Sequence, residues 1–271
     1  KWSDKLSNGF AYSVGVALSD DKAEVLSYPS NPTNKIGDGV LYKGYTVGDI
    51  WGYETGGILQ ESDFDGVGPN GKPLYHGAYF KGGQPYPGYV WYQDLDHDGV
   101  ITSGLSTVDD PGDKKVIGNN APRYRYNITA NFQYKGFDLD LMFQGVGKRD
   151  YWLKDVSSYW GGGAGSWETY NQSWTPERTD AKFPMYGSGI GSYAQSGYLL
   201  DASYIKLKQV ILGYTFPRAL INKIGLEKLR LNLAAYNLFT ISDMPKYYDA
   251  DYLSDAYPPK RTFSVGIQVG F

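Results

Sequence analysis

The chain lacks several features that would narrow its class. It has no cysteine, which excludes a disulfide framework and thiol chemistry. No apolar run reaches the length that a membrane-spanning helix requires. The net charge is −3 and no block of basic residues is present, so nucleic acid is not expected to be a partner.

Glycine and tyrosine are abundant, with 35 and 26 residues in a chain of 271. Glycine suits tight turns and narrow lumens, and tyrosine is frequent at the interfacial girdles of membrane β-barrels. The length allows one large β domain or two ordinary domains. The chain opens at Lys1-Trp2 without a signal-peptide pattern, so we expect a mature product or a fragment.

The clearest local pattern is the strict alternation over the last ten residues, Thr262–Phe271. Apolar residues occupy every second position from Phe263, and small or polar residues occupy the positions between them. Such a period of two predicts a β-strand with unlike surroundings on its two faces. In a soluble sheet the apolar row would cover a core, whereas in a membrane barrel it would face lipid.

The same alternation recurs along the chain, over residues 10–18, 123–134, 137–144 and 229–236. Each run has roughly the nine to eleven residues that a tilted strand needs to cross a bilayer. A further stretch, 203–216, changes phase once, which predicts a bulge near Lys208-Gln209. We interpret that switch as the point where the strand leaves lipid and its surroundings invert.

Short and long connections alternate between these expected strands. The turn between Tyr134 and Phe137 and the segment 217–226 are short, and the connections 19–122, 148–202 and 237–261 are long. Short periplasmic turns and long extracellular loops are typical of outer-membrane barrels. The sequence therefore predicts an all-β, transmembrane antiparallel β-barrel in the bacterial outer membrane, crossed several times, with a periplasmic C-terminus.

About six strands cannot close a barrel, because the smallest barrels have about eight. Unpaired strand edges would also be exposed to lipid, where backbone groups must be satisfied. The predicted partners therefore include outer-membrane lipid and the remainder of a larger barrel.

Several ordered motifs resemble one family. They are Gly44–Tyr53, Asp94–Ile101, Val116–Tyr124, Tyr134–Gly145, Trp174–Glu177, Tyr204–Tyr214, Asn237–Thr240 and the terminal strand. Together they resemble the C-terminal part of a SusC/RagA-type TonB-dependent outer-membrane transporter of Bacteroidetes, over residues 1–271. The resemblance implies a barrel of about 22 strands, with this chain as about the last six and the plug domain outside it. The stretch Thr102–Lys115 departs from the family by its length.

The resemblance also implies a function. Such transporters import oligosaccharides or peptides, with a SusD-like surface lipoprotein as a lid and TonB–ExbB–ExbD supplying energy. The alternatives are a passive porin-like or adhesin barrel, a barrel enzyme, and a soluble carbohydrate-binding sandwich. Neither His76 nor His97 has an evident catalytic partner, so we do not expect an enzyme.

The run Asp94-x-Asp96-x-Asp98-Gly99 is a candidate metal site. Carboxylates at alternate positions before a glycine can wrap a hard cation such as Ca²⁺, with the Val100 carbonyl as a backbone ligand. The twelfth position holds Leu105 instead of a bidentate glutamate, so a later carboxylate would have to replace it: Asp109, Asp110 or Asp113. The alternative is a solvated acidic turn.

A glycine-rich stretch after residue 150 is the candidate substrate site. The loop Tyr151–Trp174 holds Trp152, Tyr159, Trp160, Trp167, Tyr170 and Trp174 among glycines, and the first five of these are the candidate substrate contacts. Aromatic faces can stack on sugar rings, so these residues favour oligosaccharide over peptide as the expected substrate. The alternative is that these rings pack the loop on itself or onto the lipoprotein lid.

Charged residues also fall on the polar faces of the expected strands: Arg123, Arg125, Arg230, Asp138 and Asp140. They could line a translocation path. We expect most of them to form salt bridges, since a wet lumen tolerates charge.

Overall fold

The computed structural model describes residues 1–152, 167–188, 193–246, 248–253 and 259–271. The chain divides into two compact units. The first, which we call the sheet unit, comprises Lys1–Asp21, Pro122–Arg149 and Asp201–Phe271. The second, the loop unit, comprises Lys22–Ala121 and Asp150–Leu200.

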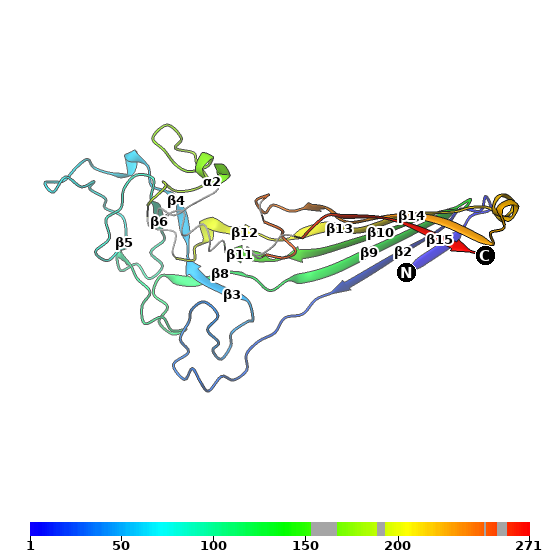
Figure 1. Ribbon diagram of the computed structural model, residues 1–271. Helices are drawn as coiled ribbons and strands as arrows, with labels where there is room; N and C mark the ends of the chain where they lie inside the picture. The colour runs from blue at the N-terminus through cyan, green and yellow to red at the C-terminus, as the bar shows by residue number, and fades with distance from the viewer. Residues whose placement is uncertain (153–166, 189–192, 247, 254–258) are drawn as a thin grey trace. The chain divides into compact units, whose positions relative to one another are not determined.

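One antiparallel sheet of seven strands forms the sheet unit. Its strands, in spatial order, are β1 (Trp2–Lys5), β2 (Ala11–Ser19), β9 (Arg123–Tyr134), β10 (Phe137–Lys148), β13 (Tyr204–Thr215), β14 (Lys228–Ile241) and β15 (Thr262–Gly270). Spatial order follows sequence order, so the sheet is a meander of long strands that run side by side (Figure 1). The six predicted strands are confirmed. The short β1 was missed, because four residues are too few for an alternation to be read.

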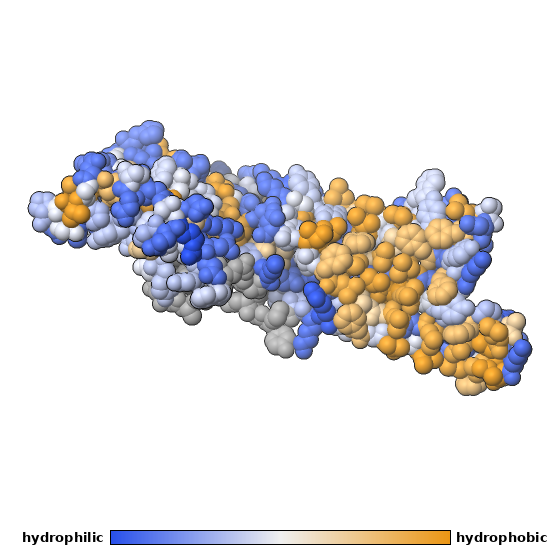
Figure 2. Space-filling view, turned by 90° about the horizontal axis from the view of Figure 1, so that it is seen from above, coloured by the Kyte–Doolittle hydropathy of each residue, from blue (hydrophilic) through white to orange (hydrophobic). Residues whose placement is uncertain are grey.

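The pairing register divides the sheet into an apolar and a polar face. One row across all seven strands is apolar throughout: Phe263, Ala235, Val210, Leu141, Ala130, Val14 and Trp2. A row of the opposite face is small, polar or charged: Gly266, Asn232, Gly213, Asp138, Gln133, Ala11 and Lys5. Apolar side chains gather in a broad patch over the sheet (Figure 2). Val265 on β15 is 75% exposed.

The predicted bulge is present, but its interpretation was wrong. Leu207 and Gln209 lie opposite the consecutive residues Phe143 and Met142 of β10, so Lys208 is the extra residue against β10. The register with β14 shifts at the same place. Leu207 lies opposite Phe143 on β10, whose alternation is unbroken, and Val210 lies opposite Leu141. Leu207 and Val210 therefore share the apolar face. The bulge restores the phase of the pattern and does not mark an inversion of the strand's surroundings.

The short connections all lie at one end of the sheet. Lys135 and Gly136 join β9 to β10 with positive φ at both residues, 46° and 87°, as a type I′ turn requires. Helices α3 (Arg218–Ile221) and η4 (Asn222–Ile224) join β13 to β14. The C-terminus lies near this end too, whereas β1 begins beside the middle of β2 and runs towards it (Figure 1). The added β1–β2 turn extends the alternation of short and long connections.

The loop unit contains most of two of the long connections predicted from the sequence. Its strands pair as β3 (Asp49–Tyr53) with β8 (Lys114–Asn119), β4 (Thr55–Ile58) with β6 (Val90–Tyr92), and β5 (Tyr79–Phe80) with β7 (Val100–Ile101). β11 (Asp150–Trp152) pairs with β12 (Leu199–Asp201), and the helices are η1 (Glu61–Asp63), α2 (Trp167–Asn171) and η3 (Ser196–Tyr198).

Aromatic rings fill the interior of the loop unit. Tyr53, Phe80 and Tyr92 meet edge to face, with centroids 5.0 to 5.6 Å apart. Burial and such contacts stabilise a unit whose paired strands are too short to do so alone. Among the described residues, no helix has both the length and the apolar character needed to cross a membrane.

The two faces of β15 predict losses of stability of different size when arginine is introduced. Val265→Arg should lower the free energy of unfolding by about 2–4 kcal/mol, because it places a cation on the face assigned to lipid near the strand centre. Ser264→Arg, one position away on the polar face, should cost less than about 1 kcal/mol. The check is urea unfolding of the full-length protein in lipid vesicles. Equal losses of unfolding free energy at the two positions would contradict the assignment of the apolar face to lipid.

Candidate functional site

A lysine–aspartate cluster lies on the polar face of β13, next to the bulge. The Lys206 Nζ is 2.6 Å from an Asp249 carboxylate oxygen and 3.6 Å from one of Asp251. The Lys208 Nζ is 2.5 Å from Asp251, and the Tyr204 hydroxyl donates to Asp251 at 2.6 Å. Lys206 is only 2% exposed, so its charge depends on these carboxylates.

The cluster fastens the connection 237–261 to the sheet. Desolvation alone would raise the pKa of Asp251, but Lys208, Tyr204 and Lys206 outweigh it and hold that pKa below its usual value. The sequence reasoning missed this cluster. The sequence contained only two signals of the cluster: the repeated lysines beside the predicted bulge and the Asp-Ala-Asp run at 249–251. Asp249 lies 43 positions after Lys206, so nothing local linked the two.

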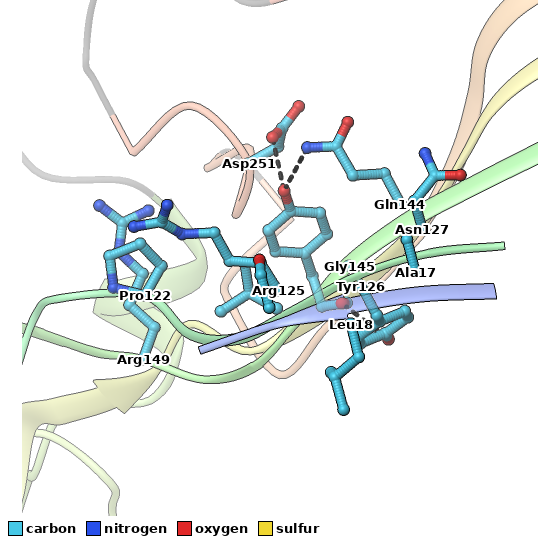
Figure 3. Close-up of a pocket in the computed structure, with 13 residues that line it drawn as sticks. Ala17, Leu18, Pro122, Arg125, Tyr126, Asn127, Gln144, Gly145, Arg149 and Asp251 are labelled. Atoms are coloured by element: carbon cyan, nitrogen blue, oxygen red, sulfur yellow. Dashed lines mark hydrogen bonds between the residues drawn. The ribbon is translucent and has the colours of Figure 1, made fainter. Parts of the chain in front are cut away.

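A polar cavity of about 420 Å³ adjoins the cluster. Its lining includes Arg125, Asn127, Gln144, Arg149 and Asp251. Asp251 and Gln144 point towards the same hydroxyl, that of Tyr204 (Figure 3). The cavity belongs to the polar side of the sheet, where a hydrated solute can be accommodated.

The predicted pairing of charged residues on the polar face is found. Arg230 and Asp138 form an ion pair at 2.6 Å across β13. Arg123 donates two hydrogen bonds to Asp20, at 2.5 and 2.6 Å, and this contact lowers the pKa of Asp20 to about 2. Arg125 lies 3.6 Å from Asp21, and Asp140 accepts a hydrogen bond from the Asn131 amide.

The predicted aromatic residues have different surroundings. Trp167 and Tyr170 on α2 stack with centroids 5.3 Å apart and an interplanar angle of 21°, and Trp167 is 75% exposed. Trp152 on β11 is buried, with 8% of its surface exposed. Tyr159 and Trp160 lie outside the described residues. Of the five candidates, only Trp167 and Tyr170 are seen to form an open aromatic surface.

The structure adds Asp113 to the acidic site predicted from the sequence. Carboxylate oxygens of Asp94, Asp96 and Asp113 all lie within 4.8 Å of one another. Asp113 is fully buried, and its oxygens accept the backbone N–H groups of Leu95 and Thr102, both at 2.7 Å. Asp113 is one of the three later carboxylates that the sequence left open.

Asp98 and Val100, the other predicted ligands, contact each other. The Asp98 carboxylate accepts the Val100 N–H at 2.8 Å and is not part of the three-carboxylate group. Desolvation raises the pKa of Asp96, and the charges of Asp113, Asp98 and Asp94 add to that rise. A bound cation would relieve this repulsion, so the donor set fits a hard divalent ion.

Comparison with known proteins identifies the group to which the chain is similar. A scan against models of known protein families finds no match. TonB-dependent receptor P3 of Formosa agariphila is 29% identical over 250 residues, covering 86% of this chain and 23% of the relative. TonB-dependent receptor P39 of the same organism is 23% identical over 300 residues, covering 97% and 28%. The chain is similar to TonB-dependent receptors over most of its length.

Two solved structures are similar to this chain in fold. The RagAB peptide importer in its open-open state matches with a TM-score of 0.67 at 18% identity, over 99% of this chain and 27% of that one. The RagAB peptide transporter matches with a TM-score of 0.65 at 17% identity, over 99% and 28%. The segment thus spans about a quarter of the length of its relatives. Their names describe receptors and importers, not enzymes.

The cluster leads to a prediction about protein stability that compares a substitution in the cluster with a control substitution outside it. Lys206→Ala leaves two buried or half-buried carboxylates without their shared cation and should lower the free energy of unfolding by about 3 kcal/mol. Arg125→Ala removes a cation that is 52% exposed and 3.6 Å from Asp21, so it should cost less than about 1 kcal/mol. Urea unfolding of the full-length receptor measures both. A Lys206→Ala cost no larger than the control would show that the cluster is not a structural anchor.

Proposed function

We propose that this chain forms a section of the wall and outer loops of an outer-membrane importer that takes up oligosaccharides in a TonB-dependent manner. The observation that carries the proposal is the seven-stranded antiparallel sheet with one apolar and one polar face. In this account the apolar face contacts lipid and the polar face lines the lumen. The similarity to TonB-dependent receptors favours import over passive diffusion or adhesion.

The orientation follows from the connections. The short turns and the C-terminus are assigned to the periplasm, and the connections 19–122, 148–202 and 237–261 to the cell exterior. The free edges of β1 and β15 pair with other strands of the receptor, because unsatisfied strand edges are costly in lipid. A closed barrel of about 22 strands satisfies this requirement.

The proposed partners come from the resemblance to SusC/RagA-type transporters. A SusD-like lipoprotein would cover the outer loops, and TonB–ExbB–ExbD would act through parts of the receptor outside this segment.

The preference for oligosaccharide rests on the stacked pair Trp167 and Tyr170. An exposed aromatic surface can contact the apolar face of a sugar ring. Peptide is the second candidate, because the RagAB structures are described as a peptide importer. That likeness, at 18% identity, extends to the fold alone.

An uptake assay separates these substrates. In cells expressing the full-length receptor, Trp167→Ala combined with Tyr170→Ala should reduce uptake of labelled oligosaccharides by about tenfold or more, since aromatic anchors dominate binding energy. Tyr28→Ala, which removes an exposed ring elsewhere in the loop unit, is the control and should leave uptake unchanged. Uptake that persists without TonB would indicate a porin, and uptake of peptides only would exclude the glycan assignment.

A second proposal concerns calcium. We propose that Asp94, Asp96 and Asp113 hold one Ca²⁺ ion, with the Asp98 loop and the Val100 carbonyl completing its surroundings. The supporting observation is that three carboxylates, one of them buried, lie within 4.8 Å of one another. The ion would fix the segment between β6 and β8 in the loop unit and has no catalytic task.

Calorimetry and thermal unfolding test the calcium proposal. The full-length receptor should bind Ca²⁺ at millimolar concentration or below, and Asp96→Asn should weaken binding by about tenfold or more through loss of an anionic ligand. Asp65→Asn changes a carboxylate that is 75% exposed and paired with His76, and should have no effect. Chelation should lower the melting temperature of the wild type by more than that of Asp96→Asn, because the variant holds the ion less tightly. No heat of binding at millimolar Ca²⁺ would end the proposal.

A further inference from the structure

A second cavity, of about 540 Å³, lies within the loop unit. Its described lining includes four aromatic side chains: Tyr45, Trp51, Tyr151 and Trp152. Two carboxylates, Asp38 and Asp49, also line it. The volume is within the range of ordinary ligand pockets and is sufficient for one or two sugar rings. The cavity brings Trp152, a residue predicted from the second long connection, together with residues of the first.

Hydrogen bonds hold two of the rings in place. The Trp51 indole N–H donates to the Tyr42 hydroxyl at 2.9 Å, and the Tyr42 and Tyr45 rings meet edge to face at 5.3 Å. The Tyr45 hydroxyl accepts the Gly48 N–H at 3.2 Å and donates to the Asp49 carbonyl at 3.3 Å. Both tyrosines are buried with Ile36 in one cluster. A ring fixed in this way loses little entropy when a ligand binds.

The charged side chains among the described lining residues are two carboxylates, Asp38 and Asp49. No lysine, arginine or histidine occurs among the described residues of the cavity. One oxygen of Asp49 accepts the Asn119 amide at 2.8 Å, which orients the carboxylate. Burial raises the pKa of Tyr45, and the charges of Asp49 and Asp38 raise it further, as expected for a negative local field.

We propose that this cavity is a subsite for one neutral sugar residue of the imported oligosaccharide. Aromatic rings pack on the apolar C–H face of a sugar, while carboxylate oxygens accept hydrogen bonds from its hydroxyl groups. The Asp49 carboxylate, whose hydrogen-bond donor Asn119 is neutral, repels uronic acids and sulfated sugars. The subsite therefore selects neutral sugars over anionic ones, and this inference rests on the proposed oligosaccharide import. An ammonium group is the competing occupant, since aromatic rings and carboxylates also bind cations.

The test uses the full-length receptor and a defined set of probes. The neutral probes are cellotetraose, mannotetraose, xylotetraose and β-1,4-galactotetraose; the anionic probe is tetragalacturonate, and the cationic probe is the peptide Lys-Ala-Lys-Ala. Calorimetry should detect binding of at least one neutral probe. Trp152→Leu should weaken it by about tenfold and Asp49→Asn by about fivefold. Tyr28→Ala is the control.

Because Trp152 is buried, Asp38→Asn provides a second variant on an exposed side chain. It should also weaken binding of the neutral probe, and Asp49→Asn should admit tetragalacturonate better than the wild type does. If neutral probes bind but none of these variants changes their affinity, the subsite lies elsewhere while oligosaccharide import stands. If only Lys-Ala-Lys-Ala binds and Asp49→Asn abolishes it, the cavity is a cation site and this inference is wrong. If no probe binds the wild type, the subsite and the glycan assignment both fail.

Discussion

The cross-strand register of the seven-stranded sheet is the constraint on which the rest of the structure depends. Each strand is bonded to its neighbours so that residues of one kind stay in line across the sheet. A slip by one residue would move every apolar side chain to the polar face. Strand backbones in lipid have no water to satisfy them, so these bonds are also obligatory. The register thus fixes both the face assigned to lipid and the face assigned to the lumen.

The bulge and the charged cluster follow from that constraint. The extra residue Lys208 lets β13 keep its apolar face aligned with β10 and β14 along the whole strand. Lys206 and Lys208 then lie together on the polar side, where Asp249 and Asp251 neutralise them. One irregularity in the sheet therefore positions the anchor of the connection 237–261. The polar cavity next to the cluster is lined by residues of four strands that this register brings together.

The sheet could largely be predicted from the sequence because alternation is a local signal. Six strands, the Lys135-Gly136 hairpin and the bulge near Lys208 were all readable in that way. β1 was not, because its four residues include two charges and show no period. The faces around the bulge were misassigned, since one strand alone does not tell which residue is the extra one. Pairing with the unbroken β10 decides it.

The sites were less predictable because distant segments build them. Asp94 and Asp96 could be named from their spacing, but the choice of Asp113 depends on a fold that buries it. Trp152 stood out as an aromatic residue, yet nothing local linked it to Trp51 or Asp49, which line the same cavity. Lys206 and Asp249 likewise come together only through the return of a long connection. The sequence named some of the acidic and aromatic residues in these sites. Only the tertiary structure shows which residues from distant segments join them.

The most direct test of the central claim is the solvent exposure of consecutive residues along β15. Spin labels placed singly at each position from Phe263 to Val269, in the full-length receptor reconstituted into lipid vesicles, report collision rates with oxygen and with a water-soluble nickel complex. Odd positions should be accessible to oxygen and protected from nickel, and even positions should show the reverse. Equal access of the nickel complex to the apolar row would contradict a lipid-facing sheet.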